Sequence, residues 1–70
     1  MLWLFQRGGE YLYCEARTCL DDSGYELVIE SDGRVRREWF ADETELERRW
    51  DRLNRELHLE GWANWHRHHR

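Results

Sequence analysis

Three clusters of turn-forming residues limit the fold of this chain more than any other feature of its sequence. They are Gly8-Gly9, residues 21–24 (DDSG) and residues 31–33 (SDG). Gly accepts positive φ angles, and Asp and Ser bond to nearby backbone groups, so each cluster marks a tight turn. The clusters separate four short segments rich in the aromatic and β-branched residues that favour strands. These segments are residues 2–7, 10–20, 25–30 and 34–40. Because short loops join antiparallel neighbours, the sequence predicts a four-stranded antiparallel meander.

Loop length sets the register in which neighbouring strands pair. The first loop consists of two glycines, suits a two-residue turn and pairs Phe5 with Leu12. The second loop, with four residues, pairs Leu20 with Tyr25. These two registers place apolar residues of the first three segments on one common face.

The third turn allows two registers. A three-residue loop over 31–33 pairs Ile29 with Val35, whereas a two-residue loop would place Arg36 opposite Ile29. We expect the three-residue loop because it keeps one face of the sheet apolar across all four strands. Arg37 is the exception on that face, and an inward-pointing charge on an edge strand discourages pairing with other chains. The expected face consists of Met1, Trp3, Phe5, Leu12, Cys14, Ala16, Thr18, Leu20, Tyr25, Leu27, Ile29, Val35 and Trp39.

The segment after residue 41 predicts one amphipathic helix. Asp42 is a preferred N-cap residue, and Glu45 completes the pattern of a capping box. Gly61 is typical of the position after a helix end, where it lets Trp62 fold back on the helix. Between these ends, apolar residues recur at helical spacing and form one stripe. They are Leu46, Trp50, Leu53 and Leu57.

The expected fold is an α+β domain of order β-β-β-β-α, in which the C-terminal helix packs on the apolar face of the sheet. Neither an isolated helix of this length nor an uncovered sheet is stable in water, so each needs the other. We expect this single domain to span residues 1–62. Residues 63–70 form a short aromatic and basic tail that we expect to fray.

The face of the sheet opposite the helix has an uneven composition. Leucines and tyrosines gather on the first two strands, and arginines alternate with glutamates elsewhere. Such a patch resembles a protein interface more than a solvated surface. In this hypothesis the apolar residues anchor a partner and the arginines orient it. The hypothetical interface consists of Leu2, Leu4, Tyr11, Tyr13, Arg17, Arg34 and Arg36.

We therefore expect a small non-catalytic protein-interaction domain that forms a homodimer through this face. One alternative is a small acidic inhibitor or adaptor that binds a different protein. Another is single-stranded nucleic-acid binding by the tyrosines and arginines of the same face. The order of four strands and a helix is similar to that of the small transcriptional-coactivator fold, which binds single strands as a dimer. The similarity is in element order alone, and a net charge of −4 opposes long-range attraction of phosphates.

The residues with reactive side chains do not combine into a catalytic, cofactor or metal site. His66, His68 and His69 could chelate a metal loosely, but a structural site needs about four ordered ligands. Cys19 is a possible thiol nucleophile, yet the sequence ties no base to it. We expect neither enzymatic activity nor a cofactor.

Cysteine spacing and hydropathy favour a cytoplasmic protein. Cys14 and Cys19 are five residues apart on one expected strand, which separates them by about 17 Å at ~3.3 Å per residue. A disulfide requires Cα atoms within roughly 7 Å, so the thiols are expected to stay reduced. The first residues resemble no signal peptide, and no stretch approaches the ~18 apolar residues of a membrane span.

Overall fold

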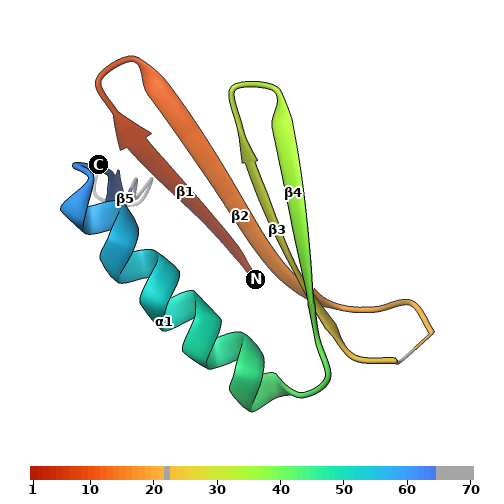
Figure 1. The fold of residues 1–70 in the computed structure, drawn as a ribbon. Coiled ribbons are helices and arrows are strands. Elements are labelled where there is room, and N and C mark those ends of the chain that lie inside the picture. Colours follow the sequence, from red (N-terminus) through yellow and green to blue (C-terminus); the bar gives the residue numbers. More distant parts are fainter. Residues whose placement is uncertain (22, 65–70) are drawn as a thin grey trace.

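The computed structural model describes residues 1–21 and 23–64 and confirms the α+β class. Figure 1 shows a meander of four long strands, a helix that follows them and a short fifth strand. The sheet is antiparallel throughout, with the order β4-β3-β2-β1-β5. The elements are β1 (Leu2–Arg7), β2 (Glu10–Thr18), β3 (Tyr25–Ser31), β4 (Arg34–Phe40), α1 (Glu43–Leu59) and β5 (Ala63–Asn64).

The first hairpin has the predicted register. Phe5 pairs with Leu12 and Trp3 with Cys14 across β1 and β2. Gly8 has a φ of 58°, a left-handed value that a side chain would disfavour. The two-residue glycine turn therefore sets this register, as expected.

The loop between β2 and β3 is longer than predicted. Thr18 pairs with Tyr25, so the predicted pairing of Leu20 with Tyr25 is wrong by two residues. The loop closes through the Cys19 N–H, which donates to the Gly24 carbonyl at 2.9 Å and leaves Leu20 fully exposed. Because the shift is an even number of residues, the side chains of β2 and β3 keep their predicted faces.

The hairpin of β3 and β4 has a two-residue loop, so the predicted three-residue register is wrong. Ser31 pairs with Arg34 and Ile29 with Arg36, so the loop consists of Asp32 and Gly33 alone. Both loop residues have positive φ angles, 56° and 78°, as a type I′ turn requires. Every side chain of β4 therefore points to the face opposite the one predicted. The helix-covered face receives Arg34, Arg36, Glu38 and Phe40, and the other face receives Val35, Arg37 and Trp39.

Helix α1 begins and ends as predicted. The carboxylate of Asp42 accepts a hydrogen bond from the Glu45 N–H at 2.9 Å, which satisfies one of the unpaired amides of the first turn. At the other end, Gly61 has a φ of 94°, and the Trp62 N–H donates to the Leu57 carbonyl at 2.9 Å. This Schellman motif turns the chain back and buries the Trp62 ring, which is only 6% exposed.

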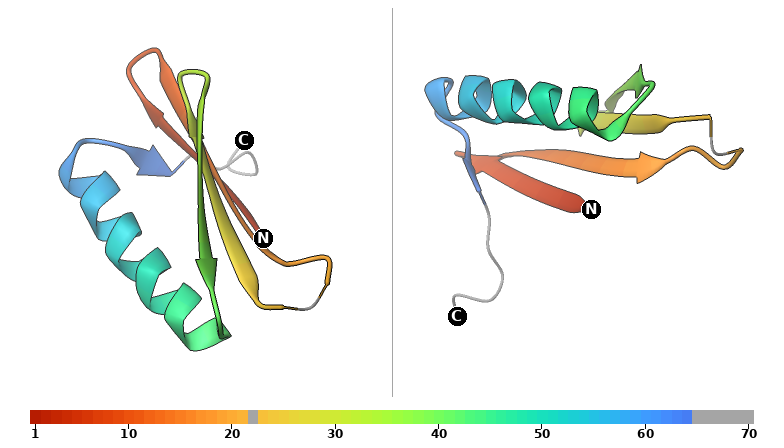
Figure 2. Two further views of the ribbon diagram at one scale, coloured as in Figure 1. Left: turned by 45° about the vertical axis from the view of Figure 1, so that its right-hand side comes forward. Right: turned by 90° about the horizontal axis from the view of Figure 1, so that it is seen from below.

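The core lies between α1 and one face of the sheet, and Figure 2 shows the helix lying across that face. Trp50 of α1 stacks on Trp3 of β1, with ring centroids 3.9 Å apart. Phe5 is fully buried beside them. The buried core cluster consists of Phe5, Leu12, Cys14, Leu27, Ile29, Leu46, Leu53, Leu57 and Trp62.

Strand β5 adds a pairing that the sequence analysis did not predict. Ala63 pairs with Gln6 and Asn64 with Phe5, so the chain returns from the helix to the outer edge of β1. Arg7 holds this return in place, since its guanidinium lies 4.4 Å from the Trp62 ring centroid and donates to the Glu60 carbonyl at 2.9 Å. Residues 65–70, the rest of the predicted tail, lie outside the described residues.

Candidate interaction surface

The sheet face that the helix leaves uncovered is the candidate functional surface, here called the open face. The observed register of β4 changes the predicted composition of the open face, because Val35 and Trp39 lie there in place of Arg34 and Arg36. The sequence predicted the correct faces for the first three strands and the wrong face only for the fourth. The open face consists of Leu2, Leu4, Gln6, Tyr11, Tyr13, Glu15, Arg17, Glu26, Val28, Glu30, Val35, Arg37 and Trp39.

Four apolar and tyrosine side chains gather on the β1–β2 half of the open face, and we call this group the apolar corner. Its members are Leu2, Leu4, Tyr11 and Tyr13, the residues predicted to anchor a partner. Leu4 lies directly opposite Tyr13, and both are half-buried. Leu2 and Tyr11 are each 58% exposed, so the corner presents apolar surface that no described residue covers.

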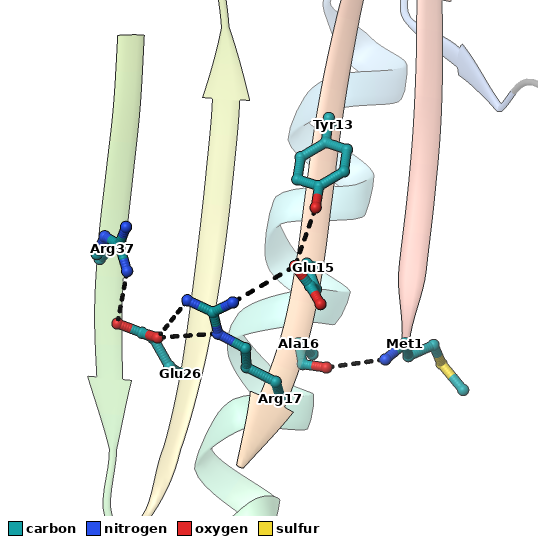
Figure 3. A network of polar contacts seen from close by, with 7 residues as sticks. All are labelled: Met1, Tyr13, Glu15, Ala16, Arg17, Glu26 and Arg37. Atoms are coloured by element: carbon teal, nitrogen blue, oxygen red, sulfur yellow. Dashed lines mark hydrogen bonds and ion pairs between the residues drawn. The ribbon is translucent and has the colours of Figure 1, made fainter. Parts of the chain in front are cut away.

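A chain of polar contacts crosses the middle of the open face (Figure 3). The Tyr13 hydroxyl donates to Glu15 at 2.9 Å, and this bond is the main reason that the pKa of the tyrosine is raised. Arg17 lies 3.7 Å from Glu15 and donates to Glu26 at 3.1 Å. These contacts link Tyr13 of the apolar corner to the charged residues beside it.

The arginines of the open face are paired with carboxylates. Glu26 lies between Arg17, at 3.1 Å, and Arg37, at 3.6 Å. Glu30 adds another negative charge on the same face, so carboxylates outnumber guanidinium groups there. A phosphate backbone would have to displace these carboxylates, which lowers the attraction of the surface for nucleic acid.

Trp39 and Val35 extend exposed apolar surface along β4. They are 57% and 50% exposed, although both were predicted to lie under the helix. The indole of Trp39 packs against Gly24, where an added Cβ would lie 2.9 Å from the ring nitrogen. The Asp-Gly turn was the sequence signal that could have placed both residues correctly, because Asp-Gly favours two-residue hairpins.

Arg34 and Arg36 lie on the other side of the sheet, so their predicted place on the open face is wrong. There they line a groove between α1 and β4, with Leu12 and Ile29 at its base and Glu56 on the helix side. Arg36 lies 3.9 Å from Glu38, a carboxylate that Arg49 of the helix binds with two hydrogen bonds, of 2.7 and 3.1 Å. An ion pair thus joins helix α1 to β4, and the pKa of Glu38 is lowered by its bonds to Arg49.

The cysteines and histidines form no reactive cluster in the described residues. Cys14 and Cys19 are both free thiols. Burial raises the pKa of Cys14 to about 11, so its thiol stays protonated at neutral pH. Within residues 1–21 and 23–64, no group of three His, Cys, Asp or Glu side chains could hold a metal ion. His66, His68 and His69 lie outside this range.

Comparison with known proteins adds no family to these observations. No protein-family model, curated protein or solved structure matches the chain. Among the described residues, no helix is long and apolar enough to cross a membrane.

Proposed function

We propose that the chain is a small protein-interaction domain that self-associates through the apolar corner of its open face. The observation that carries this proposal is the exposure of Leu2 and Tyr11 beside Leu4 and Tyr13, on a sheet face that no helix covers within residues 1–21 and 23–64. Monomeric proteins rarely leave several large apolar side chains together in water. A second copy would bring the same four residues to its side of the contact, as a two-fold interface requires.

The chemistry of the corner suits protein association. Tyrosine provides a broad contact area at low conformational cost, and its hydroxyl tolerates both solvent and a partner. Each 100 Å² of apolar area removed from water contributes about 2.5 kcal/mol before the cost of association. The bordering carboxylates and guanidinium groups would fix the orientation of the second copy more than its affinity.

Nucleic-acid binding has less support than association. That alternative relied on Arg34 and Arg36, which lie on the helix-covered face, while Arg17 is paired with Glu26. The open face keeps tyrosines and one tryptophan for stacking but offers few unpaired positive charges for phosphates.

A comparison of two acidic substitutions tests the proposal. Tyr11→Glu places a charge in the apolar corner, whereas Leu59→Glu places one on the helix, where the leucine is 88% exposed and outside the open face. Light scattering after gel filtration should show a native mass above 8.8 kDa for the unaltered chain and for Leu59→Glu. Tyr11→Glu should lower that mass. A single chain at every concentration, or an equal mass for both variants, would show that the corner is not an association surface.

A further inference from the structure

The outer edge of β4 is a second surface with backbone groups available for binding. Strand β4 ends the sheet order, and no described strand pairs with its outer side over residues 34–40. The opposite edge differs, because β5 covers Phe5 and Gln6 of β1. An uncovered edge of seven residues is a template for another strand unless its side chains prevent pairing.

The hairpin geometry determines which amides point outward from β4. In a two-residue hairpin the closing pair, here Ser31 and Arg34, exchanges both backbone hydrogen bonds. Hydrogen-bonded and non-hydrogen-bonded pairs then alternate along the strands. Residues 36 and 38 therefore direct their N–H and C=O groups toward β3. The residues that direct theirs outward are Val35, Arg37 and Trp39.

We propose that β4 pairs antiparallel with β4 of a second copy, about a two-fold axis at Arg37. In this register Val35 lies opposite Trp39 of the second copy, and Arg37 lies opposite its own counterpart. Every outward N–H of these three residues then meets an outward C=O, and every outward C=O meets an N–H. The backbone alone thus gives this register a complete set of interchain hydrogen bonds.

The side chains complement one another in the same register. On the helix-covered face, Arg36 lies opposite Glu38 of the second copy, and the symmetry repeats this pair. Arg36 is free to move toward it, since its only described carboxylate contact is Glu38 of its own chain, at 3.9 Å, and its side chain is 65% exposed. The Glu38 carboxylate has lone pairs beyond those used by Arg49. On the open face, the exposed Val35 and Trp39 cover each other.

Neighbouring registers place like charges together. An axis at residue 36 sets Arg36 opposite itself, and an axis at residue 38 sets Glu38 opposite itself, and like charges directly opposite destabilise a strand pair. The axis at Arg37 also opposes two guanidinium groups, but each lies 3.6 Å from Glu26 of its own chain. Three arginines on one edge discourage a foreign apolar strand, so a second copy is the occupant that the charges favour.

Pairing at β4 goes beyond the association proposed at the apolar corner and does not depend on it. The corner lies on β1 and β2, toward the opposite end of the strand order from β4. A two-fold axis perpendicular to the sheet joins the two open faces into one continuous surface, with both helices on the opposite side. Edge and corner can therefore be occupied together.

Amide hydrogen exchange, followed by NMR across a range of protein concentrations, tests the edge directly. The measurement uses the Tyr11→Glu variant, so that association at the corner cannot hide the result. The amides of Val35, Arg37 and Trp39 should exchange about tenfold more slowly once nine-tenths of the chains are paired. The amides of Arg36 and Glu38 bond to β3 and should be protected at every concentration. If the three outward amides do not respond to concentration, the edge proposal is wrong, whatever the corner does.

Substitutions at the axis give opposite expected results. Arg37→Pro removes an outward N–H but no bond to β3, and it should abolish the concentration dependence at Val35 and Trp39. Arg37→Thr keeps the N–H and removes the like charge, so it should strengthen the pairing several-fold. Arg36→Glu, which changes only an exposed side chain, should weaken pairing even if the proline variant fails to fold. Unchanged protection in both Arg36→Glu and Arg37→Thr would contradict the proposed register.

Discussion

Helix α1 contacts β1 and β4, the first and last strands of the meander, in different ways. Against β1 the contact is aromatic and apolar, with Trp50 stacked on Trp3 and Phe5 fully buried. Against β4 the contact includes an ion pair, in which Arg49 is bound to Glu38 through two hydrogen bonds. The first contact removes large apolar surfaces from water, and the second fixes two charged groups in one geometry.

The two contacts therefore contribute differently to the stability of the fold and to the alignment of its strands. Apolar burial stabilises a fold in proportion to area but tolerates small shifts, because it has no direction. A guanidinium with two hydrogen bonds to one carboxylate allows a single arrangement. We infer that the contact with β1 provides most of the stabilisation, while the Arg49–Glu38 contact reinforces the face of β4 that the Asp32-Gly33 turn directs toward the helix.

Of the substitutions that test this comparison, Phe5→Ala should lower the free energy of unfolding the most. Removing a fully buried ring costs about 4 kcal/mol in the free energy of unfolding, a large share of the 5–15 kcal/mol typical of a domain. Urea unfolding followed by circular dichroism measures this loss. Leu20→Ala is the control, because Leu20 is fully exposed in the loop after β2, outside the apolar corner, and its substitution should change stability by less than about 1 kcal/mol. Equal losses in both variants would show that β1 does not carry the core.

Glu38→Gln should cost about 2 kcal/mol, since it removes a charge-assisted pair of hydrogen bonds that is partly buried. Folding lowers the pKa of Glu38 from its ordinary value of 4.5, so the unfolded chain takes up this proton first as the pH falls. The stabilisation is therefore complete well above pH 4.5 and is lost as the pH falls through the lowered pKa.

Urea unfolding at pH values from neutral to acid checks this dependence. The Gln variant should lose less stability in acid than the unaltered chain. Glu10→Gln is the matched control, because Glu10 forms an exposed ion pair with Arg7 that is expected to contribute under about 1 kcal/mol. Parallel acid curves for the unaltered chain and Glu38→Gln would rule out the ionic contact as a source of pH dependence.

The last prediction concerns the reaction rates of the two thiols and involves no change in stability. Cys14 is fully buried and its pKa is raised to about 11, whereas Cys19 lies half-buried in the loop after β2. A disulfide reagent at neutral pH should modify Cys19 first and reach Cys14 only as the chain unfolds. Cys19→Ser should remove the fast reaction. A fast reaction that persists in this variant would mean that the core around Cys14 opens readily.

Local signals were sufficient for much of this fold. The Gly8-Gly9 turn fixed the first register, and Asp42 and Gly61 marked the helix ends, because each acts through its own backbone neighbours. The even shift at the second loop left the faces of β2 and β3 as predicted. The apolar corner lies on β1 and β2, whose register the Gly8-Gly9 turn sets, and it was therefore located from the sequence.

The fourth strand could not be placed by counting apolar residues. The apolar side chains of Val35 and Trp39 favour a place under the helix, but β4 is an edge strand on which both stay exposed. The charge that belongs under the helix, Glu38, finds its partner in Arg49, and nothing local in the sequence indicates that pair. Strand β5 was missed for a similar reason, because two residues that pair with β1 carry no periodicity of their own.

The stacked indoles of Trp3 and Trp50 also give the folded chain a spectroscopic signal. Their rings lie within 20° of parallel, one on the first strand and one on the helix. Electronic transitions of chromophores at this spacing couple, and the coupling weakens steeply as the helix separates from the sheet. The molecule thus carries an intrinsic optical reporter of helix docking that needs no dye or label.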